Sequence, residues 1–509
     1  MYYYYYQIIF QYILTSFYLF FFIKKLIYKG YMTSLYLTTN QLWINESTKI
    51  LLSKQISVQK LSKLFTHIYF SWDQIYYQYK LLYKWQIQEL PLFIIKPIND
   101  LEICKILRLI KKYKLLLRII SGKHSSNIYK PQIYVDMTGY DCIQITKNSL
   151  IVQGGVTQGK IYEFLFDNKY NYVFPGGSAG SVGVTGLSTS GGLGTLKRTF
   201  GLASDNVLSY TIITPAYGKI TVYPDDDLFW ALSGGVASNF GFVTQLEYKL
   251  TPINQVIHYH VYWKLPSIDQ SINIITIWLS HSNSLNYKFN ETLSFYSNTD
   301  LFLEISGIYV GSDYHIVKDH LTYLTNLNPT EFGIEIMTYQ QSMQKLGTAR
   351  IYQPFSVSKT LFKQQINQVD TIVEFIYQTL VFPGIKIFGI ELLGGKILEK
   401  SNTSFYPRNY NYFIDIFTYC DDIITLRLME NWSDELFKLL YIPPDIVYVG
   451  FPIPLLPDHG RAYYGDNYPR LVQIKLKYDP HNLLAYPQGI VPPSQIPPSV
   501  ISTYTHHHL

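Results

Sequence analysis

The sequence predicts an α+β protein built from two domains. A chain of 509 residues is longer than one ordinary hydrophobic core supports. Hydrophobic residues make up 48% of it and charged residues 15%, a balance typical of globular proteins and not of disordered chains. Short apolar or alternating stretches, typical of strands, are interspersed with stretches of helical period. We expect the first domain to end at Pro252, which closes a strand pattern.

Residues 1–50 form an N-terminal extension with a hydrophobic segment at residues 8–23. This segment is short for a membrane span of about 20 residues, and no basic region precedes it. It is a candidate for a signal, for an anchor that would associate the protein with a membrane, or for a simple extension. Met32 is an alternative start that would remove it. The sequence therefore leaves secretion and membrane association open.

The part of the chain at residues 55–252 is expected to alternate strands with short helices. Its clearest elements are a buried strand at Leu90–Pro97, a helix at Leu101–Tyr113 capped by Asn99 or Asp100, a strand from Leu115 into a polar turn at Ser121, strands near residues 134–137 and 149–155, and a helix near Lys160–Asp167. Residues 204–223 have the pattern of two further strands, and Asp227–Leu250 that of a short helix, a turn and a strand. This part of the chain is therefore predicted to be a β-rich α+β domain.

The run FPGGSAGSVGVTGLSTSGGLG, Phe174 to Gly194, contains eight glycines among small hydroxyl and apolar residues. Glycine lets the backbone approach a flat or phosphorylated ligand closely and leaves N–H donors exposed, so the run predicts a cofactor cradle. The alternative is a flexible linker, which the interspersed Val182, Val184 and Leu187 disfavour. There is no P-loop pattern, and Lys197 stands where the third glycine of a dinucleotide-binding fingerprint would fall.

Residues 253–450 are predicted to form a second α+β domain, with a strand at Leu301–Gly311 and a helix at His315–Leu324. Residues 451–492 contain a proline-broken loop and then a helix expected from Asp466 to Tyr478. Residues 493–509 are a polar tail.

Several classes of function are disfavoured by the composition. The net charge of +6 is spread along the chain without a basic stripe, so no nucleic-acid partner is expected. The three cysteines, Cys104, Cys142 and Cys420, lie far apart without metal-ligand spacing. His258 and His260 would share one face of a strand, but a pair without a third ligand is more often ordinary packing, so no metal is expected.

Six stretches together resemble, in this order, the berberine bridge enzyme-like FAD-linked oxidoreductases, whose FAD-binding domain is of the p-cresol methylhydroxylase type. The stretches are RIISGKHS, VQGGVTQGKIYEFL, FPGGSAGSVGVTGLSTSGGLG, GLASDNVLSYTIITPAYGKI, DLFWALSGGVASNFGFVT and YYGDNYPRLVQIKLKYDPHNLLAYPQGI. The resemblance implies an FAD domain made of residues 55–252 and the C-terminal segment 451–492, with a substrate domain at residues 253–450 inserted between them.

The resemblance also implies how FAD is held. The turn from Ser121 to Ser125 matches the family's R-S-G-G-H-S loop, and His124 stands where the histidine bonds covalently to the flavin 8α carbon. Lys123 replaces the second glycine, so the backbone there must avoid a positive φ or bear modest strain. Ala179 replaces the cysteine of a second link, which implies a single histidyl link. The remaining cofactor contacts implied are Ser121, Gly122, Ser125, Gly177, Ala179, Ser181, Val182, Gly183, Gly186, Gly191, Gly192, Val243 and Asn467.

The implied activity is oxidation of an alcohol or sugar-like small molecule, with hydride passing to the flavin and electrons then passing to oxygen to give hydrogen peroxide. Val182 falls at the family's gate over the oxygen-reactive carbon and resembles members that react with oxygen, which favours an oxidase. The alternatives are a dehydrogenase that uses another acceptor and a degenerate flavin-binding structural protein.

The catalytic residues of the family transfer less completely to this sequence. Two positions where members often have tyrosine are Ser126 and Leu193 here. The family pattern Y-x-N-Y-x-D is reduced to Tyr448, our candidate for the group that takes the substrate hydroxyl proton, with its acidity raised by its neighbours. A role in the core is equally compatible. Tyr464 is a second candidate at the pocket, and Glu391 could be a base, although a single carboxylate on a strand is more often structural.

Overall fold

The computed structural model describes residues 42–81, 91–125, 131–282, 284–297, 300–347, 355–380, 382–399, 401–454, 456 and 458–490. The hydrophobic segment at residues 8–23, Met32, Ser126 and the tail at residues 493–509 lie outside these ranges. Within the described ranges, no helix combines the length and the apolar character that crossing a membrane requires.

The first part of the chain forms a four-stranded sheet in the order β1-β2-β4-β3, in which β2, β4 and β3 are parallel. Its strands are β1 (Ile68–Phe70), β2 (Phe93–Ile95), β3 (Leu117–Ile120) and β4 (Ile133–Asp136). Its helices are α2 (Val58–Leu64), α3 (Gln74–Leu81) and α4 (Asp100–Tyr113). The side chain of Asn99 caps α4, accepting a hydrogen bond from the backbone N–H of Glu102 at 3.0 Å, as the sequence predicts.

A five-stranded antiparallel sheet follows in the order β5-β6-β10-β8-β9. Its strands are β5 (Ile143–Ile145), β6 (Ser149–Gln153), β8 (Val207–Thr214), β9 (Gly218–Val222) and β10 (Phe242–Lys249). Between them lie the helices α5 (Gln158–Asp167), α6 (Val184–Thr189), α7 (Lys197–Phe200) and α8 (Asp227–Leu232) and the short strand β7 (Tyr172–Val173), which pairs with β11 (Thr251–Pro252). The chain leaves this domain through β11.

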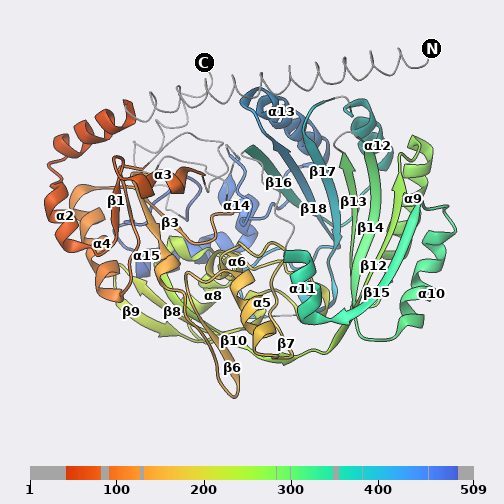
Figure 1. Cartoon of the computed structure of the whole chain (residues 1–509), viewed down its shortest axis with the longest axis horizontal. Helices are drawn as coiled ribbons and strands as arrows, with labels where there is room; N and C mark the ends of the chain where they lie inside the picture. Colours follow the sequence, from red (N-terminus) through yellow and green to blue (C-terminus); the bar gives the residue numbers. More distant parts are fainter. Residues whose placement is uncertain are drawn as a thin grey trace, which may run out of the picture.

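The second domain is a seven-stranded antiparallel sheet in the order β15-β12-β14-β13-β17-β18-β16. Its strands are β12 (Gln255–Lys264), β13 (Phe289–Ser297), β14 (Leu301–Val310), β15 (Glu331–Thr338), β16 (Phe355–Lys363), β17 (Ile385–Leu392) and β18 (Tyr412–Cys420). Its helices are α9 (Ile268–Ser282), α10 (Tyr314–Thr325), α11 (Tyr339–Gly347), α12 (Val369–Gln378) and α13 (Ile423–Leu440). Four of these, α9, α10, α12 and α13, cover one face of the sheet, and the other face turns toward the first domain (Figure 1).

The C-terminal segment returns to the first domain through α14 (His459–Tyr464) and α15 (Tyr468–Tyr478). The helix predicted from Asp466 therefore begins two residues later, after a short 3₁₀ turn at Gly465–Asn467. The Tyr478 hydroxyl donates to Asp227 Oδ1 at 2.8 Å, which fastens the end of α15 to the start of α8. The fold is therefore α+β, with a first domain completed by the C-terminal segment and a second domain inserted between them, as the sequence predicts.

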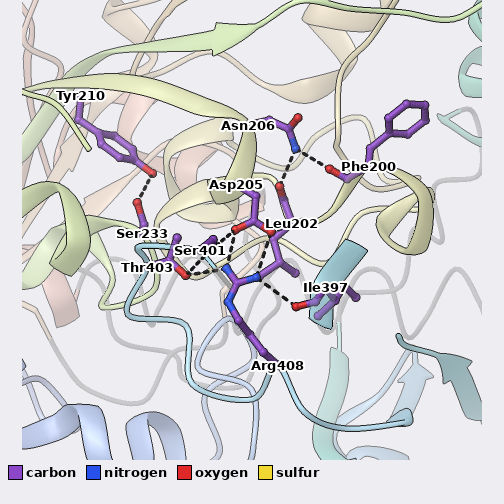
Figure 2. A network of polar contacts seen from close by, with 10 residues as sticks. All are labelled: Phe200, Leu202, Asp205, Asn206, Tyr210, Ser233, Ile397, Ser401, Thr403 and Arg408. Carbon is purple, nitrogen blue, oxygen red and sulfur yellow. Dashed lines mark hydrogen bonds and ion pairs between the residues drawn. The ribbon is translucent and has the colours of Figure 1, made fainter. Parts of the chain in front are cut away.

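Two arginines, the buried Arg198 and the partly buried Arg408, join the domains. Arg198, on α7, donates through Nε to the carbonyl of Leu393 at 2.8 Å and through Nη2 to that of Leu285 at 2.8 Å. Arg408, which follows β17, forms an ion pair with Asp205 in the first domain (Figure 2). These contacts hold the open face of the second sheet against the glycine-rich part of the first domain.

Candidate functional site

A cavity of about 1930 Å³ lies where the two domains meet. Its walls are the turn after β3, the glycine run, the open face of the second sheet, and the loop that precedes α14. Pockets for drug-sized ligands measure roughly 300–1,000 Å³, so this cavity has room for a dinucleotide together with a second small molecule.

The turn after β3 and the glycine run touch backbone to backbone. A Cβ atom added to Gly122 would lie 2.1 Å from the amide nitrogen of Gly183 and 2.3 Å from the carbonyl oxygen of Ser181. A Cβ added to Gly183 would in turn lie 2.0 Å from Ser121 Oγ. Only glycine fits at either position, so the two predicted loops form one continuous wall of the cavity.

His124 stands on this wall with its imidazole directed at the other loop. Its Nε2 and the Oγ of Ser181 are 2.6 Å apart and share a hydrogen bond. Both residues line the cavity, together with Ser121 and Ser125. The turn therefore presents an oriented imidazole within the space that a ligand would enter.

The sequence allowed Lys123 either to avoid a positive φ or to bear modest strain, and the structure shows the strained conformation. Its φ is +62°, in the left-handed region that a lysine rarely adopts. Its Nζ lies 4.2 Å from the ring centroid of Tyr79, whose hydroxyl donates to Asp136 Oδ2 at 2.7 Å. Burial lowers the pKa of Lys123, and the charge of Asp136 opposes that shift. The ammonium group is therefore packed into the cavity wall.

Side chains of α5 hold the glycine run in shape. Gln158 Oε1 accepts from the Gly177 N–H at 2.8 Å, and its Nε2 donates to the carbonyl of Ala179 at 2.5 Å. The Tyr162 hydroxyl donates to the carbonyl of Gly177 at 2.9 Å. At Gly186 no heavy atom lies within 4 Å of an added Cβ, so bare backbone borders open space there. Val182 and Val243 also line the cavity.

Tyr448 lines the cavity, with its hydroxyl held by the end of the glycine run. The hydroxyl oxygen accepts from the Gly192 N–H at 3.3 Å and lies 3.1 Å from Ser190 Oγ. Burial raises the pKa of Tyr448, and these hydrogen bonds oppose the shift only in part. The expectation that its neighbours make Tyr448 more acidic is therefore wrong, because the phenol keeps its proton near neutral pH.

Four of the predicted residues lie behind the cavity wall and do not line it. Gly191 packs against the Phe405 ring, where a Cβ would fall 2.2 Å from a ring carbon, and Gly192 bonds the Tyr448 hydroxyl as described. Tyr464 is fully buried and stacks on Tyr468 at 6.0 Å between ring centroids. The Asn467 side chain donates to the carbonyl of Ser404 at 3.1 Å. The structure gives these residues contacts that support the wall.

A charged cluster that the sequence did not reveal lies on the open face of the second sheet. Glu391 on β17 lines the cavity and forms an ion pair with Lys197, which is 5% exposed. Asp415 on β18 is opposite Gly389, so it is the diagonal neighbour of Glu391 on the same face. Burial, and next the charge of Glu391, hold the pKa of Asp415 well above its usual range. The cluster thus places an acid with a raised pKa beside a carboxylate that is paired with a lysine.

The cluster is invisible in the sequence because its members come from three separate segments. The only signal was the alternation of Phe413, Asp415 and Phe417, which places a carboxyl group on the same face as two aromatic rings. Pairing of β17 with β18 is what brings Glu391 to that face beside Asp415.

Other candidates from the sequence lie elsewhere. Cys104, Cys142 and Cys420 are free thiols outside the cavity lining. His258 shares a hydrogen bond with Ser342, and His260 Nε2 lies 3.7 Å from Glu331 Oε1. No group of three metal-ligating side chains occurs in the part of the chain that the structure describes.

The residues present fit a flavin dinucleotide. The volume is sufficient, bare glycine backbone borders open space at Gly186, and the wall opposite the glycine run carries aromatic rings. Backbone N–H groups without Cβ atoms near them suit a diphosphate, and apolar surfaces suit a flat ring system.

Comparisons with known proteins agree with this fit. A family model described as FAD binding domain matches residues 91–223, and one described as berberine and berberine like matches residues 447–491. A protein of Bacillus subtilis named uncharacterized FAD-linked oxidoreductase YgaK is 24% identical over 411 residues, which cover 77% of this chain and 90% of that protein. Berberine bridge enzyme-like 24 of Arabidopsis thaliana is 25% identical over 453 residues, covering 79% of this chain and 84% of that protein.

Solved structures share the fold. The berberine bridge enzyme from Eschscholzia californica superimposes with a TM-score of 0.74 at 18% sequence identity, covering 86% of this chain and 100% of that one. A chitooligosaccharide oxidase superimposes with a TM-score of 0.69 at 17% identity, covering 79% of this chain and 92% of that one.

Proposed function

Because the chain is a berberine bridge enzyme-like FAD-linked oxidoreductase, we propose that it is an oxidase with FAD linked covalently to His124 alone. Its substrate is an alcohol or sugar-like small molecule, and dioxygen is the final acceptor, which leaves as hydrogen peroxide. The observation that carries the proposal is that one cavity brings together an oriented histidine, a glycine cradle and a carboxylate paired with a buried lysine.

The turn and the glycine run would hold FAD, which supplies the acceptor for the substrate's hydride when it is bound. Ser121, Gly122 and the run from Gly177 to Gly186 offer backbone donors and open space for it. The open face of the second sheet would hold the substrate. Its rings, Phe413 and Phe417, line the cavity and keep water from the reacting atoms.

Glu391 is the residue of this cavity best suited to accept the substrate's hydroxyl proton. Its carboxylate is paired with Lys197, whereas burial raises the pKa of Tyr448 and its phenol stays protonated near neutral pH. Asp415, whose pKa is raised by burial and then by the charge of Glu391, is the neighbouring acid on the same face of the sheet. Tyr448 then orients the end of the glycine run through Ser190 and Gly192. A positioned general base typically contributes about 10²- to 10⁴-fold to the rate.

The side chain of Val182 supports reaction with oxygen. It is a small residue on the cavity wall, held between a hydrogen bond from its own N–H to Ala179 at 3.0 Å and one from the Gln158 N–H to its carbonyl at 2.9 Å. Its position on a fixed backbone leaves that part of the cavity open to a diatomic molecule.

The test begins with the absorbance spectrum of the purified protein and acid precipitation of the wild type and a His124→Ala variant. We expect the yellow colour to stay in the pellet of the wild type and to be released into the supernatant of the variant. A panel of alcohols and sugars is then added without air, followed by oxygen, while flavin absorbance and peroxide are followed. Flavin that is reduced by a substrate but reacts slowly with oxygen would make the protein a dehydrogenase. If dithionite reduces the flavin but no substrate in the panel does, the protein is a structural flavoprotein.

A further inference from the structure

Ser181 is held more rigidly than its place in a glycine-rich loop would imply. The residues on either side of it are bonded to the start of α5, through the Gly159 N–H to the carbonyl of Gly180 at 2.7 Å and the Gln158 N–H to that of Val182 at 2.9 Å. Its own carbonyl oxygen lies against Gly122. The Ser181 hydroxyl therefore has a fixed place relative to the turn that carries His124.

The hydrogen bond between Ser181 Oγ and His124 Nε2 orients the imidazole, so that Nε2 faces Ser181 and Nδ1 lies on the other side of the ring. At 2.6 Å it is a short bond, and the two residues are 57 positions apart in sequence, so it is not a consequence of local geometry. In a neutral imidazole one nitrogen carries a proton and the other a lone pair. Where the hydroxyl accepts the Nε2 proton, Nδ1 carries the lone pair, and where it donates to Nε2, Nδ1 carries the proton. Only the first arrangement makes Nδ1 a nucleophile.

We propose that Ser181 is the positioning residue for covalent attachment of the flavin, and that it directs the bond to Nδ1 of His124. This inference rests on the proposed histidyl link. When Nδ1 bonds to the flavin 8α carbon, that carbon loses one proton and the ring system gains two electrons, which dioxygen then takes up as hydrogen peroxide. The imidazole becomes positively charged as the bond forms, and the Ser181 oxygen accepts a stronger hydrogen bond from the charged ring.

The strained backbone at Lys123 also helps to fix the position of His124. Its left-handed backbone turns the chain immediately before His124, and its ammonium packs on Tyr79. The backbone of the turn is thus fixed on one side by this contact and on the other by the close approach of Gly122 to Gly183. The hydrogen bond to Ser181 acts on the ring itself and limits its rotation.

The experiment compares four full-length proteins: the wild type, Ser181→Ala, Ser181→Thr and Ser280→Ala. Ser280 is an exposed serine on α9, outside the cavity lining, and is the control for loss of a serine hydroxyl. Each protein is incubated with excess FAD in air. Samples taken over time are precipitated with acid, and flavin is measured in the pellet, where it is covalent, and in the supernatant, where it was only bound.

We expect covalent incorporation to be about fivefold slower or more in Ser181→Ala, the factor that corresponds to one lost hydrogen bond. Total bound FAD should be unchanged in this variant. Ser181→Thr, which keeps the hydroxyl, should restore the rate, and Ser280→Ala should match the wild type. Peptide mapping by mass spectrometry should find the flavin on His124 in every labelled protein.

The other outcomes separate this inference from the proposed function. Equal rates in the wild type and Ser181→Ala would overturn the role of Ser181 and leave the histidyl link intact. Loss of total bound FAD in Ser181→Ala, not rescued by threonine, would make Ser181 a structural residue of the cradle. Wild-type protein that binds FAD but never retains it in the pellet would overturn the histidyl link itself, and the positioning role with it.

Discussion

Arg408 forms a bidentate contact with Asp205, with hydrogen bonds from Nη2 to Oδ1 at 2.5 Å and from Nη1 to Oδ2 at 3.2 Å. The carboxylate also accepts from the Leu202 N–H at 3.0 Å and the Ser401 hydroxyl at 2.9 Å (Figure 2). Each of its two oxygens therefore accepts two hydrogen bonds. The side chains are only 15% and 13% exposed. The pair joins the segment after the glycine run to the loop between β17 and β18.

Replacing Arg408 with alanine should lower the free energy of unfolding by about 3 kcal/mol, because it leaves the Asp205 charge buried without its partner. The midpoint of urea denaturation measures this. Lys396→Ala is the matched control, since it breaks the exposed pair of Lys396 with Glu399, with an expected cost below about 1 kcal/mol. If the two variants lower the free energy of unfolding equally, the Arg408–Asp205 pair contributes no more to stability than an exposed pair does.

Glu391→Gln should slow reduction of the flavin by the substrate by about 10²-fold or more, because the glutamine cannot take up the hydroxyl proton. Tyr448→Phe should have a much smaller effect on the same step, since burial keeps its phenol protonated. Both rates are measured by anaerobic stopped-flow mixing with the substrate found by the panel. If Tyr448→Phe were the slower variant, the original assignment of Tyr448 as the base would stand and Glu391 would be structural.

The elements that the sequence predicted well are those whose signals are local. The helix α4 has its cap at Asn99 and its apolar residues within one continuous stretch, and both signals can be read without knowledge of the fold. The same holds for the turn at Ser121 and for the glycine run, whose residue types follow from the close backbone approach that the structure shows.

What the sequence did not reveal depends on pairing between distant segments. Glu391 looked like a single carboxylate on a strand, because the register that sets it beside Asp415 and the helix that brings Lys197 to it lie outside its neighbourhood. The placement of Tyr448 was expected, but its raised pKa was not, because the pKa of a phenol depends on burial and hydrogen bonds that only the folded chain defines.

Val182→Phe should slow reaction of the reduced flavin with oxygen by about tenfold, which corresponds to about 1.4 kcal/mol of added barrier. The larger ring would fill space at the cavity wall that valine leaves open. The anaerobic rate of reduction by substrate should change much less. The two rates are separated by reducing the protein without air and then mixing it with oxygen. A Val182→Phe protein that reacts with oxygen as fast as the wild type would show that oxygen arrives by another route.

His258 should make the stability of the protein fall as the pH is lowered from about 6.5 toward about 4. Its Nε2 bonds Ser342 Oγ at 2.6 Å, and burial, followed by the charge of Lys345, lowers its pKa to about 4, with Glu335 opposing. The unfolded chain, with a histidine pKa of about 6.5, therefore takes up the proton first as the pH falls. The stabilisation is complete above about pH 6.5 and is lost on the way down to about pH 4.

Partial exposure of His258 to solvent limits this loss to about 1–2 kcal/mol. Urea denaturation at pH 7.5 and at pH 5 measures it, with His258→Gln as the comparison, because glutamine can still bond Ser342 and does not titrate. The wild type should lose more stability than the variant between the two pH values, since only its histidine must stay neutral in the folded state. Equal losses would mean that the folded protein accommodates the charged imidazole, through Glu335, as well as the unfolded chain does.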